Sequence, residues 1–124
     1  MDIYRENILD HYRNPRNNGN INNPDASEVG FNPLCGDRIK IQVKVEGGKL
    51  QDIQFKAQGC AVSIATASML SEYAQGMSLD NLRKLSKDDI LELVGISLSP
   101  TRLKCALLSL KTLQRAVKKL QKGG

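Results

Sequence analysis

The sequence predicts an α+β domain in which a small antiparallel three-stranded sheet is packed on one side by helices. Residues 38–57 alternate between apolar and polar side chains around Gly47-Gly48, which is typical of a β-hairpin. Residues 61–121 instead repeat their apolar residues every three or four positions, as helices do. Because no internal repeat and no linker-like break separates these parts, we expect one domain over residues 1–124.

The N-terminal part of the chain is expected to form a helix and then a long loop. Residues 2–13 carry an apolar stripe, and Asp2 stands where a helix N-cap is favoured. The helix is expected to end at Asn14, because the residue before a proline is pushed out of the helical region. Residues 14–27 are rich in Asn, Gly and Pro, which indicates a loop that crosses the surface before a short strand at residues 28–31.

The hairpin provides the other two strands of the sheet. Residues 38–46 form its first strand, whose apolar face carries Ile39, Ile41, Val43 and Val45. The opposite face carries Lys40, Gln42 and Lys44, so we expect one side of the sheet to be buried and the other to face water. Residues 50–57 form the returning strand, with a break in phase near residues 51 and 52.

The rest of the chain is expected to be helical, over residues 61–74, 79–85, 87–94 and 100–121. Small residues and serines dominate the first of these helices. Ser78, Ser86 and Ser99 stand at the N-cap positions of the other three, where a side-chain oxygen can accept from a free backbone amide. Pro100 fits the first position of the last helix, because its missing N–H is not needed there.

The chain is basic, with a formal net charge of +5 from 18 basic and 13 acidic residues. The excess lies mainly in the last helix, at Lys104, Lys111, Arg115, Lys118, Lys119 and Lys122. None of the two Phe and three Tyr residues is interleaved with these cations, so the sequence offers no stacking platform for nucleic acid. We interpret the basic stretch as a solvated helix face or a docking surface for an acidic protein partner.

Membrane association and secretion are not expected. No run of about 18 apolar residues suggests a membrane span, and the N-terminus lacks the basic-then-apolar order of a signal peptide. We therefore expect a cytoplasmic protein whose thiols stay reduced.

Three cysteines stand at predicted joints between elements. Cys35 precedes the first hairpin strand and is separated from Asp37 only by a glycine; Cys60 opens a helix; and Cys105 lies in the first turns of the last helix, beside Lys104. An odd number of cysteines argues against a disulfide framework. The alternative, that each is a small buried apolar residue, applies to a lone cysteine better than to three in such positions.

The residue types at these joints suit a metal or cluster site. Three thiolates select zinc, copper(I) or iron–sulfur chemistry, and an aspartate adds a weaker, more easily replaced bond. The cysteines do not form two C-x-x-C pairs, which argues against a structural zinc ribbon. The helix N-terminus at Cys60 and the cation beside Cys105 lead us to expect more thiolate character than in a free cysteine at all three sites.

Four linked motifs carry a resemblance to a known family, namely DHYRNPRN at residues 10–17, NPLCGD at 32–37, QGCA at 58–61 and RLKCA at 102–106. In order and spacing they resemble the U-type iron–sulfur cluster assembly scaffold family, which comprises IscU, SufU and the N-terminal domain of NifU. The resemblance covers essentially the whole chain. It implies a SufE/NifU-like two-layer fold and a scaffold rather than an enzyme. Such a scaffold accepts sulfur from a cysteine desulfurase, assembles a transient [2Fe–2S] cluster and passes it to acceptor apo-proteins.

The same resemblance implies that Cys35, Asp37, Cys60 and Cys105 hold iron or the [2Fe–2S] cluster, and that Zn²⁺ can bind at the same place. Cys105 is expected to be the leading acceptor of persulfide sulfur, with Cys35 as its competitor because the loop of Cys35 can move.

Lys104 is the main departure from the family pattern. IscU-type members have a histidine there, and a protonated lysine has no lone pair to give a metal, so we expect Lys104 to act electrostatically. Lysine at this position is similar to SufU-type members, which implies an alternative function: a zinc-dependent sulfurtransferase that accepts persulfide without building a cluster. Those members carry an insertion between the second and third cysteines, whereas here 44 residues lie between positions 60 and 105, as in the compact IscU type.

The same resemblance bears on three further features of the sequence. Residues 98–102 stand where IscU-type proteins bind an Hsp70-type chaperone and keep one proline and a basic end. His11 is expected to be stabilised by the C-terminus of its own helix rather than to act as a ligand. Arg13 and Arg16 are expected to form part of the surface that docks the desulfurase.

Overall fold

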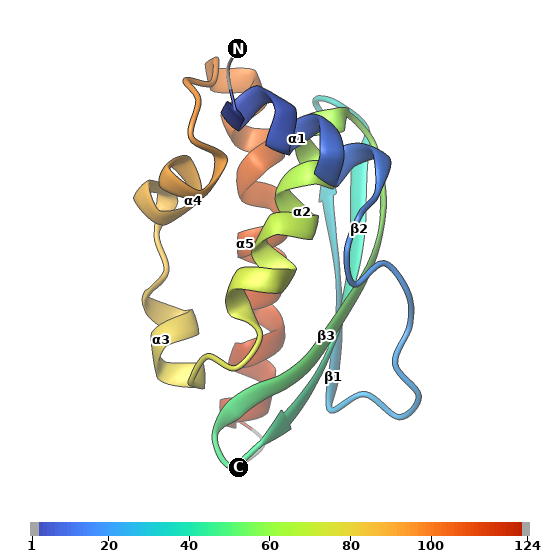
Figure 1. The fold of residues 1–124 in the computed structure, drawn as a ribbon. Coiled ribbons are helices and arrows are strands. Elements are labelled where there is room, and N and C mark those ends of the chain that lie inside the picture. The colour runs from blue at the N-terminus through green and yellow to red at the C-terminus, as the bar shows by residue number, and fades with distance from the viewer. Residues whose placement is uncertain (1–2, 123–124) are drawn as a thin grey trace.

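A computed structural model describes the backbone of residues 3–122 and the side chains of residues 3–120 (Figure 1). The elements follow in the order α1 (Ile3–Arg13), β1 (Ala26–Asn32), β2 (Asp37–Glu46), β3 (Lys49–Gln58), α2 (Ala61–Ala74), α3 (Leu79–Lys84), α4 (Lys87–Val94) and α5 (Pro100–Lys122). The predicted α+β class with a three-stranded antiparallel sheet is confirmed. The helices lie on one side of the sheet, as Figure 1 shows. The expected N-cap Asp2 lies outside the described residues.

The sheet has the strand order β1-β2-β3. The hairpin turns at Gly47-Gly48, as predicted, and both glycines have positive φ. The register shifts where Lys44 faces Asp52 but Val45 faces Leu50, so that Gln51 is an extra residue in β3. This β-bulge is the physical cause of the break in phase that the sequence shows there.

The first strand is longer than predicted. It was expected at residues 28–31, but it pairs with β2 from Ala26, opposite Val43, to Asn32, opposite Asp37. The polar residues at the ends of β1 interrupt the apolar–polar alternation by which a strand is recognised in the sequence. They belong to the strand because they pair with β2 and not because of their own β propensity.

The core lies between the inner face of the sheet and the two helices α2 and α5. The sheet contributes fully buried side chains, among them Ile39, Ile41, Val43, Leu50, Ile53 and Phe55. The helices contribute residues such as Leu70, Ala106, Leu113 and Val117. Helix α2 is buried on most of its surface, and its small residues allow neighbouring elements to approach closely. None of the helices within residues 3–122 is both long and apolar enough to cross a lipid bilayer.

Parts of both sheet edges are covered by other segments of the chain. Next to β3, the amide of Phe55 donates to the carbonyl oxygen of Asn17, and the amide of Gly19 donates to the carbonyl oxygen of Phe55. Farther along the same edge, the amide of Leu50 donates to the carbonyl oxygen of Met77. The backbone groups that an edge strand would expose are therefore satisfied at Leu50 and Phe55 of β3.

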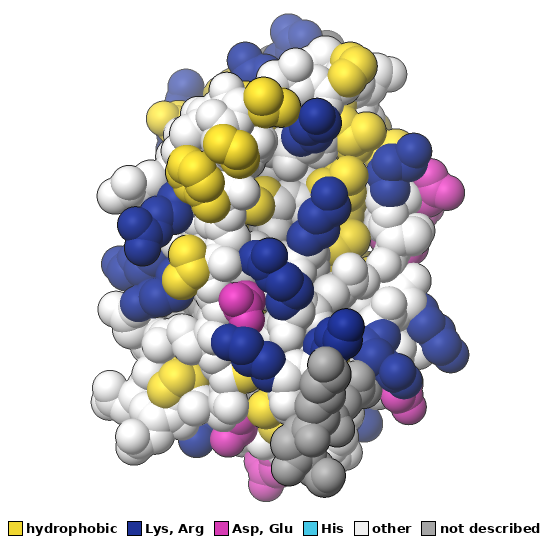
Figure 2. All heavy atoms as spheres, turned by 180° about the vertical axis from the view of Figure 1, so that it is seen from behind, with side chains coloured by type: hydrophobic (Ala, Val, Ile, Leu, Met, Phe, Trp, Pro, Cys, Tyr) yellow, Lys and Arg dark blue, Asp and Glu magenta, His cyan; other side chains and the backbone are white. Residues whose placement is uncertain are grey.

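The edge of β1 is covered by cations from α5. The guanidinium of Arg115 donates to the carbonyl oxygen of Val29 at 2.9 Å, and Nζ of Lys119 donates to that of Ser27 at 3.0 Å. Lys119 also pairs with Glu28 at 2.8 Å, and its hydrogen bond lowers the pKa of that carboxyl group. Part of the basic stretch that we interpreted as a solvated or docking face therefore holds the last helix against the sheet. Many Lys and Arg side chains lie on the face of the molecule that Figure 2 shows.

The loop after α1 crosses the outer face of the sheet, as predicted. Its Asn20 side chain accepts a hydrogen bond from Nζ of Lys40, and the amide of Ile21 donates to the side chain of Gln42. The polar face of β2 is thus partly covered by this loop rather than wholly open to water.

The serines of α2 bind the end of α1. Nδ1 of His11 lies 2.7 Å from Oγ of Ser68, which also accepts a hydrogen bond from the amide of Arg16. Nε2 of His11 faces the carboxylate of Glu72 at 3.7 Å. His11 thus lies in the last turn of α1, as expected, but its side chain is buried and held by α2. Burial is the main cause that lowers its pKa, and the charge of Arg16 adds to it.

We predict that His11 makes folding stability fall as the pH is lowered below about 7. In the unfolded chain histidine binds its proton near pH 6.5, whereas in the folded protein burial lowers this pKa. The contribution is fully present above about pH 6.5 and is lost as the pH falls through the lower pKa of the folded state. The free energy of unfolding, measured in urea at a series of pH values, should fall over this range.

The His11→Asn variant is the control, because it keeps a polar group facing Ser68 but does not titrate. Its stability should stay nearly constant over the same range. The carboxyl groups of Asp10 and Glu28, whose pKa values are lowered by hydrogen bonds from Arg16 and Lys119, titrate at lower pH and do not interfere. Parallel curves for the two proteins below about pH 7 would contradict the prediction.

Candidate metal centre

The predicted ligands come from three joints of the fold. Cys35 lies in the turn between β1 and β2, Asp37 begins β2, and Cys105 lies in the second turn of α5. The Sγ atoms of the two cysteines and a carboxylate oxygen of Asp37 all lie within 4.8 Å of one another. The ligand atoms of a tetrahedral zinc–thiolate site are about 3.8 Å apart, given Zn–S bonds of about 2.3 Å, so small side-chain movements bring these three to coordinating distance.

Asp37 is the most constrained member of the group. Its side chain is completely buried, and Oδ1 accepts a hydrogen bond of 2.9 Å from the backbone amide of Cys60. Oδ2 faces the side-chain amide of Asn32 at 3.5 Å. These partners offset the cost of burying a carboxylate. They also fix the junction between β3 and α2 to the start of β2.

Cys60 lies next to the group but not fully within it. It is the N-cap residue of α2, as predicted, and is half-buried. Its thiol interacts with that of Cys105. Its Sγ is not part of the set of three ligand atoms that share the 4.8 Å limit. The structure thus brings three of the four predicted ligands together and leaves the fourth at their margin.

The cysteines differ strongly in accessibility. Cys35 is exposed, whereas Cys105 is 1% exposed. Burial raises the pKa of the Cys105 thiol, and hydrogen bonds with Asp37, Cys60 and Cys35 raise it further. The expectation of extra thiolate character is therefore wrong for Cys105. The nearby cation Lys104 is exposed, and within residues 3–120 it forms no ion pair, so it does not compensate for this burial.

Asn32 is a further residue of the candidate site, to which the sequence pattern assigned no role. Its side chain is buried, and Nδ2 lies 3.9 Å from Sγ of Cys105 as well as facing Asp37. Its Oδ1 accepts from the amide of Leu34, which closes the turn that carries Cys35. Asparagine before proline in a turn is a local signal for such side-chain-to-backbone bonding, but the contact with α5 is not visible in the sequence.

Two other predicted features lie elsewhere. His11 contacts Ser68 on α2 and is not among the residues that gather at the metal centre. Residues 99–102, at the start of α5, are exposed, and the Ser99 side chain caps the helix by accepting from the amide of Arg102. Pro100 is the first residue of α5, as predicted.

A model of the NifU-like N terminal domain matches residues 3–123. The chain belongs to this family. The resemblance seen in the four sequence motifs is thereby confirmed.

Two curated members of the family illustrate its range. The zinc-dependent sulfurtransferase SufU of Bacillus subtilis is 37% identical over 139 positions, which cover 98% of this chain and 93% of that protein. The iron–sulfur cluster assembly scaffold protein IscU of Escherichia coli K12 is 37% identical over 119 positions, which cover 92% of this chain and 91% of that protein. Since 139 positions exceed the 124 residues of this chain, the alignment with SufU contains gaps in this chain.

Solved structures of the family share the fold. FiSufU from the thermophile Fervidobacterium islandicum AW-1 matches with a TM-score of 0.80 at 26% identity, covering 90% of this chain and 94% of that chain. A NifU-like protein (N-terminal) from Brucella abortus matches with a TM-score of 0.81 at 21% identity, covering 98% and 96%. The second likeness concerns the fold alone.

We predict that Gly59→Ala disrupts the metal centre. Gly59 has φ of +142°, and a Cβ at this position would clash with the carboxylate and the backbone of Asp37. The substitution should lower the free energy of unfolding by about 3 kcal/mol or more, because backbone strain and displacement of a buried carboxylate add. Urea unfolding measures the loss.

Gly76→Ala is the matched control, because Gly76 also has positive φ but has open space where a Cβ would lie. Gly76→Ala should lower the free energy of unfolding only by the backbone strain, about 1–2 kcal/mol. Equal losses in the two variants would mean that close approach to Asp37 does not determine the residue at position 59.

Proposed function

We propose that the protein is an iron–sulfur cluster assembly scaffold. The observation that carries this proposal is the convergence of Cys35, Asp37 and Cys105 from three joints of the fold, in a chain that belongs to the NifU-like family. Thiolates bind iron and zinc, and one carboxylate among them gives a weaker bond. A site of this kind can bind iron or a cluster and release it again.

The proposed ligand set is Cys35, Asp37, Cys60 and Cys105, and the proposed cargo is iron and a transient [2Fe–2S] cluster. Cys60 completes the set through a small movement at the β3–α2 junction, where its thiol already interacts with Cys105. The carboxylate of Asp37 is the ligand that an acceptor protein can replace. Lys104 lies exposed beside the centre and acts on approaching partners through its charge.

Sulfur arrives as a persulfide on a partner's cysteine. The thiolate of Cys35 attacks the outer sulfur, the S–S bond of the donor breaks, and the donor leaves as a thiolate while Cys35 becomes the persulfide. Exposure favours Cys35 as the first acceptor, because Cys105 is buried and its thiol has a raised pKa. This reverses the order expected from the sequence, in which Cys105 leads.

The proposed partners are a cysteine desulfurase as sulfur donor and apo-proteins as cluster acceptors. The exposed face of α1 with Arg13 is the proposed contact for the desulfurase, and residues 98–102 are the proposed contact for an Hsp70-type chaperone. Because the proposed chemistry needs reduced thiols, the cytoplasm is the proposed compartment.

A zinc-dependent sulfurtransferase is the second candidate. It is favoured by Lys104 in place of a histidine and by the 37% identity to the protein named zinc-dependent sulfurtransferase SufU. The ligand atoms fit a zinc ion as well as an iron site, since three of them already lie within 4.8 Å. When bound there, zinc would be held by the same four residues and would keep the thiols deprotonated.

Anaerobic reconstitution with iron, sulfide and a cysteine desulfurase separates the two functions. A stable species that absorbs visible light, with iron and acid-labile sulfide in equal amounts, supports the scaffold. Zinc that stays bound through turnover, together with faster cycling of the desulfurase and no such absorbance, would reject the scaffold and support the transferase.

We predict that Asp37→Ala gives a more persistent cluster. The variant lacks the replaceable oxygen ligand through which transfer begins, so the visible absorbance of the reconstituted protein should decay severalfold more slowly. Transfer to an acceptor apo-protein should slow in parallel. Decay is followed by absorbance after exposure to a chelator.

Asp52→Ala is the control, because it removes a carboxylate from β3 far from the three gathered ligands. Its cluster should decay at the rate of the unaltered protein. Thermal unfolding of both variants shows whether loss of the hydrogen bond between Asp37 and the amide of Cys60 by itself destabilises the protein. A cluster that decays faster in Asp37→Ala than in Asp52→Ala would contradict the proposed role of Asp37.

A further inference from the structure

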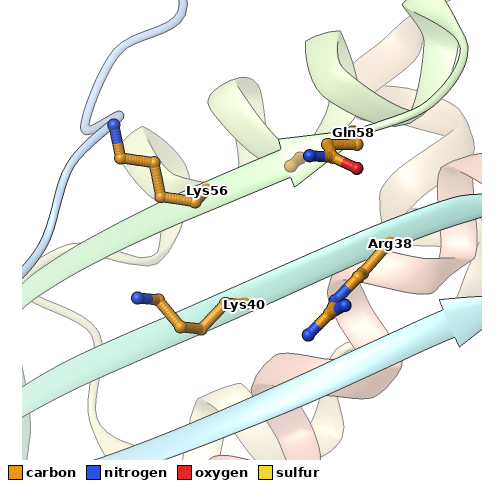
Figure 3. A pocket seen from close by; sticks show the side chains of 5 residues that line it. Arg38, Lys40, Lys56 and Gln58 are labelled. Carbon is orange, nitrogen blue, oxygen red and sulfur yellow. The ribbon is translucent and has the colours of Figure 1, made fainter.

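The outer face of the sheet carries a basic pocket near the metal centre. It has a volume of about 310 Å³ and is lined by Arg38, Lys40, Lys56, Ala57 and Gln58 (Figure 3). Every charged residue in this lining is a cation. The pocket is formed where β2 begins and β3 ends, which is the same end of the sheet as the metal centre.

The strand register brings these cations together. Lys40 faces Lys56 directly across β2 and β3, and Arg38 faces Gln58 in the neighbouring pair. Like charges directly opposite each other destabilise a sheet. Lys40 is held by the neutral side chain of Asn20, and none of the ion pairs within residues 3–120 includes these three cations. The pocket therefore lacks the negative charge that would balance it.

Exposed apolar side chains lie beside the basic pocket. On β1, Val29 faces Lys40 and Phe31 faces Arg38, so both lie on the same outer face. Phe31 is 62% exposed and Val29 is 44% exposed, while Leu34 in the adjoining turn is 69% exposed. Large apolar side chains exposed together on one face indicate an interaction surface.

We propose that the basic pocket and the exposed side chains of Val29 and Phe31 form a docking surface for an acidic segment of a partner protein. In this segment carboxylates alternate with aromatic or aliphatic side chains. The carboxylates occupy the pocket, and the apolar side chains cover Phe31 and Val29. Charge complementarity supports this occupant, because every charged residue that lines the pocket is a cation and the whole chain carries a net charge of +5. A free anion would use the cations but leave the apolar residues exposed.

The docking surface borders both loops of the metal centre. Arg38 directly follows Asp37, and Gln58 is two residues before Cys60. A segment bound in the pocket therefore lies beside the turn of Cys35 and the start of α2. The inference goes beyond the proposed function and does not depend on it, because the pocket and its charges exist whatever cargo the cysteines hold.

Binding of a synthetic peptide to the full chain tests the proposal. The probe is a short fluorescein-labelled peptide in which Asp and Glu alternate with Phe and Leu, and anisotropy reports binding. The double substitution Arg38→Gln and Lys56→Gln should weaken binding about tenfold, equivalent to about 1.4 kcal/mol. The matched control, Lys111→Gln and Lys118→Gln, removes the same charge from the exposed face of α5 and should weaken binding less than about twofold.

Other outcomes overturn the proposal. Equal weakening in the two double variants would mean that only net charge matters. If a peptide with serine in place of Phe and Leu binds as tightly, apolar contacts with Phe31 and Val29 do not contribute to binding. Inorganic phosphate that displaces the peptide at low concentration in a manner dependent on Arg38 and Lys56 would identify a free-anion site. A short DNA duplex that binds more tightly than the peptide through the same residues would identify a nucleic-acid site.

Stability gives an independent readout. Lys40 and Lys56 face each other and repel, so Lys56→Gln should raise the midpoint of thermal unfolding. Lys118→Gln should leave the midpoint nearly unchanged. A lower midpoint for Lys56→Gln would show that Lys56 contributes to the fold and would contradict the charge argument.

Discussion

The buried carboxylate of Asp37 ties together the loops that make the metal centre. It accepts from the backbone amide of Cys60, faces the side chain of Asn32, and lies against Cys105. A buried carboxylate is tolerated only with such partners, and Gly59 leaves the space that it needs. The proposed metal ligand with the weakest bond is therefore also the group that organises the surrounding protein. In the proposed function, metal exchange and local structure are linked through one side chain.

Stability and binding are divided between the two sides of the sheet. The inner face is packed against α2 and α5, with Ile39, Ile41 and Phe55 fully buried. The outer face, near the metal centre, retains features that do not help the protein fold, namely facing lysines and an exposed Phe31. Because the inner face is well packed, the fold tolerates this charge repulsion and apolar exposure on the outer face. Local conflicts of this kind are expected at binding sites.

Local chemistry made the hairpin and the helix starts predictable from the sequence. Gly47-Gly48 sets the turn, and Ser78 and Ser99 accept from amides in the first turns of their helices, as their positions indicate. The motifs also indicated the three residues that gather at the candidate metal centre, Cys35, Asp37 and Cys105, but not that Cys60 stays at its margin. Contacts between distant segments were not predictable. They include Asn32 against Cys105, the burial that raises the pKa of that thiol, and the hold of α5 on the edge of β1. Each depends on how α5 packs, which no local pattern encodes.

The covered sheet edges also limit how other proteins can bind. Arg115 and Lys119 occupy backbone carbonyls of β1, while residues 17–19 and Met77 occupy backbone groups of β3. At these positions an incoming strand finds no free backbone group, so pairing there would require the displacement of Arg115, Lys119 or the segments at residues 17–19 and 77. Strand addition depends on a row of main-chain hydrogen bonds along a sheet edge. A partner that leaves these contacts in place must therefore bind elsewhere on the surface.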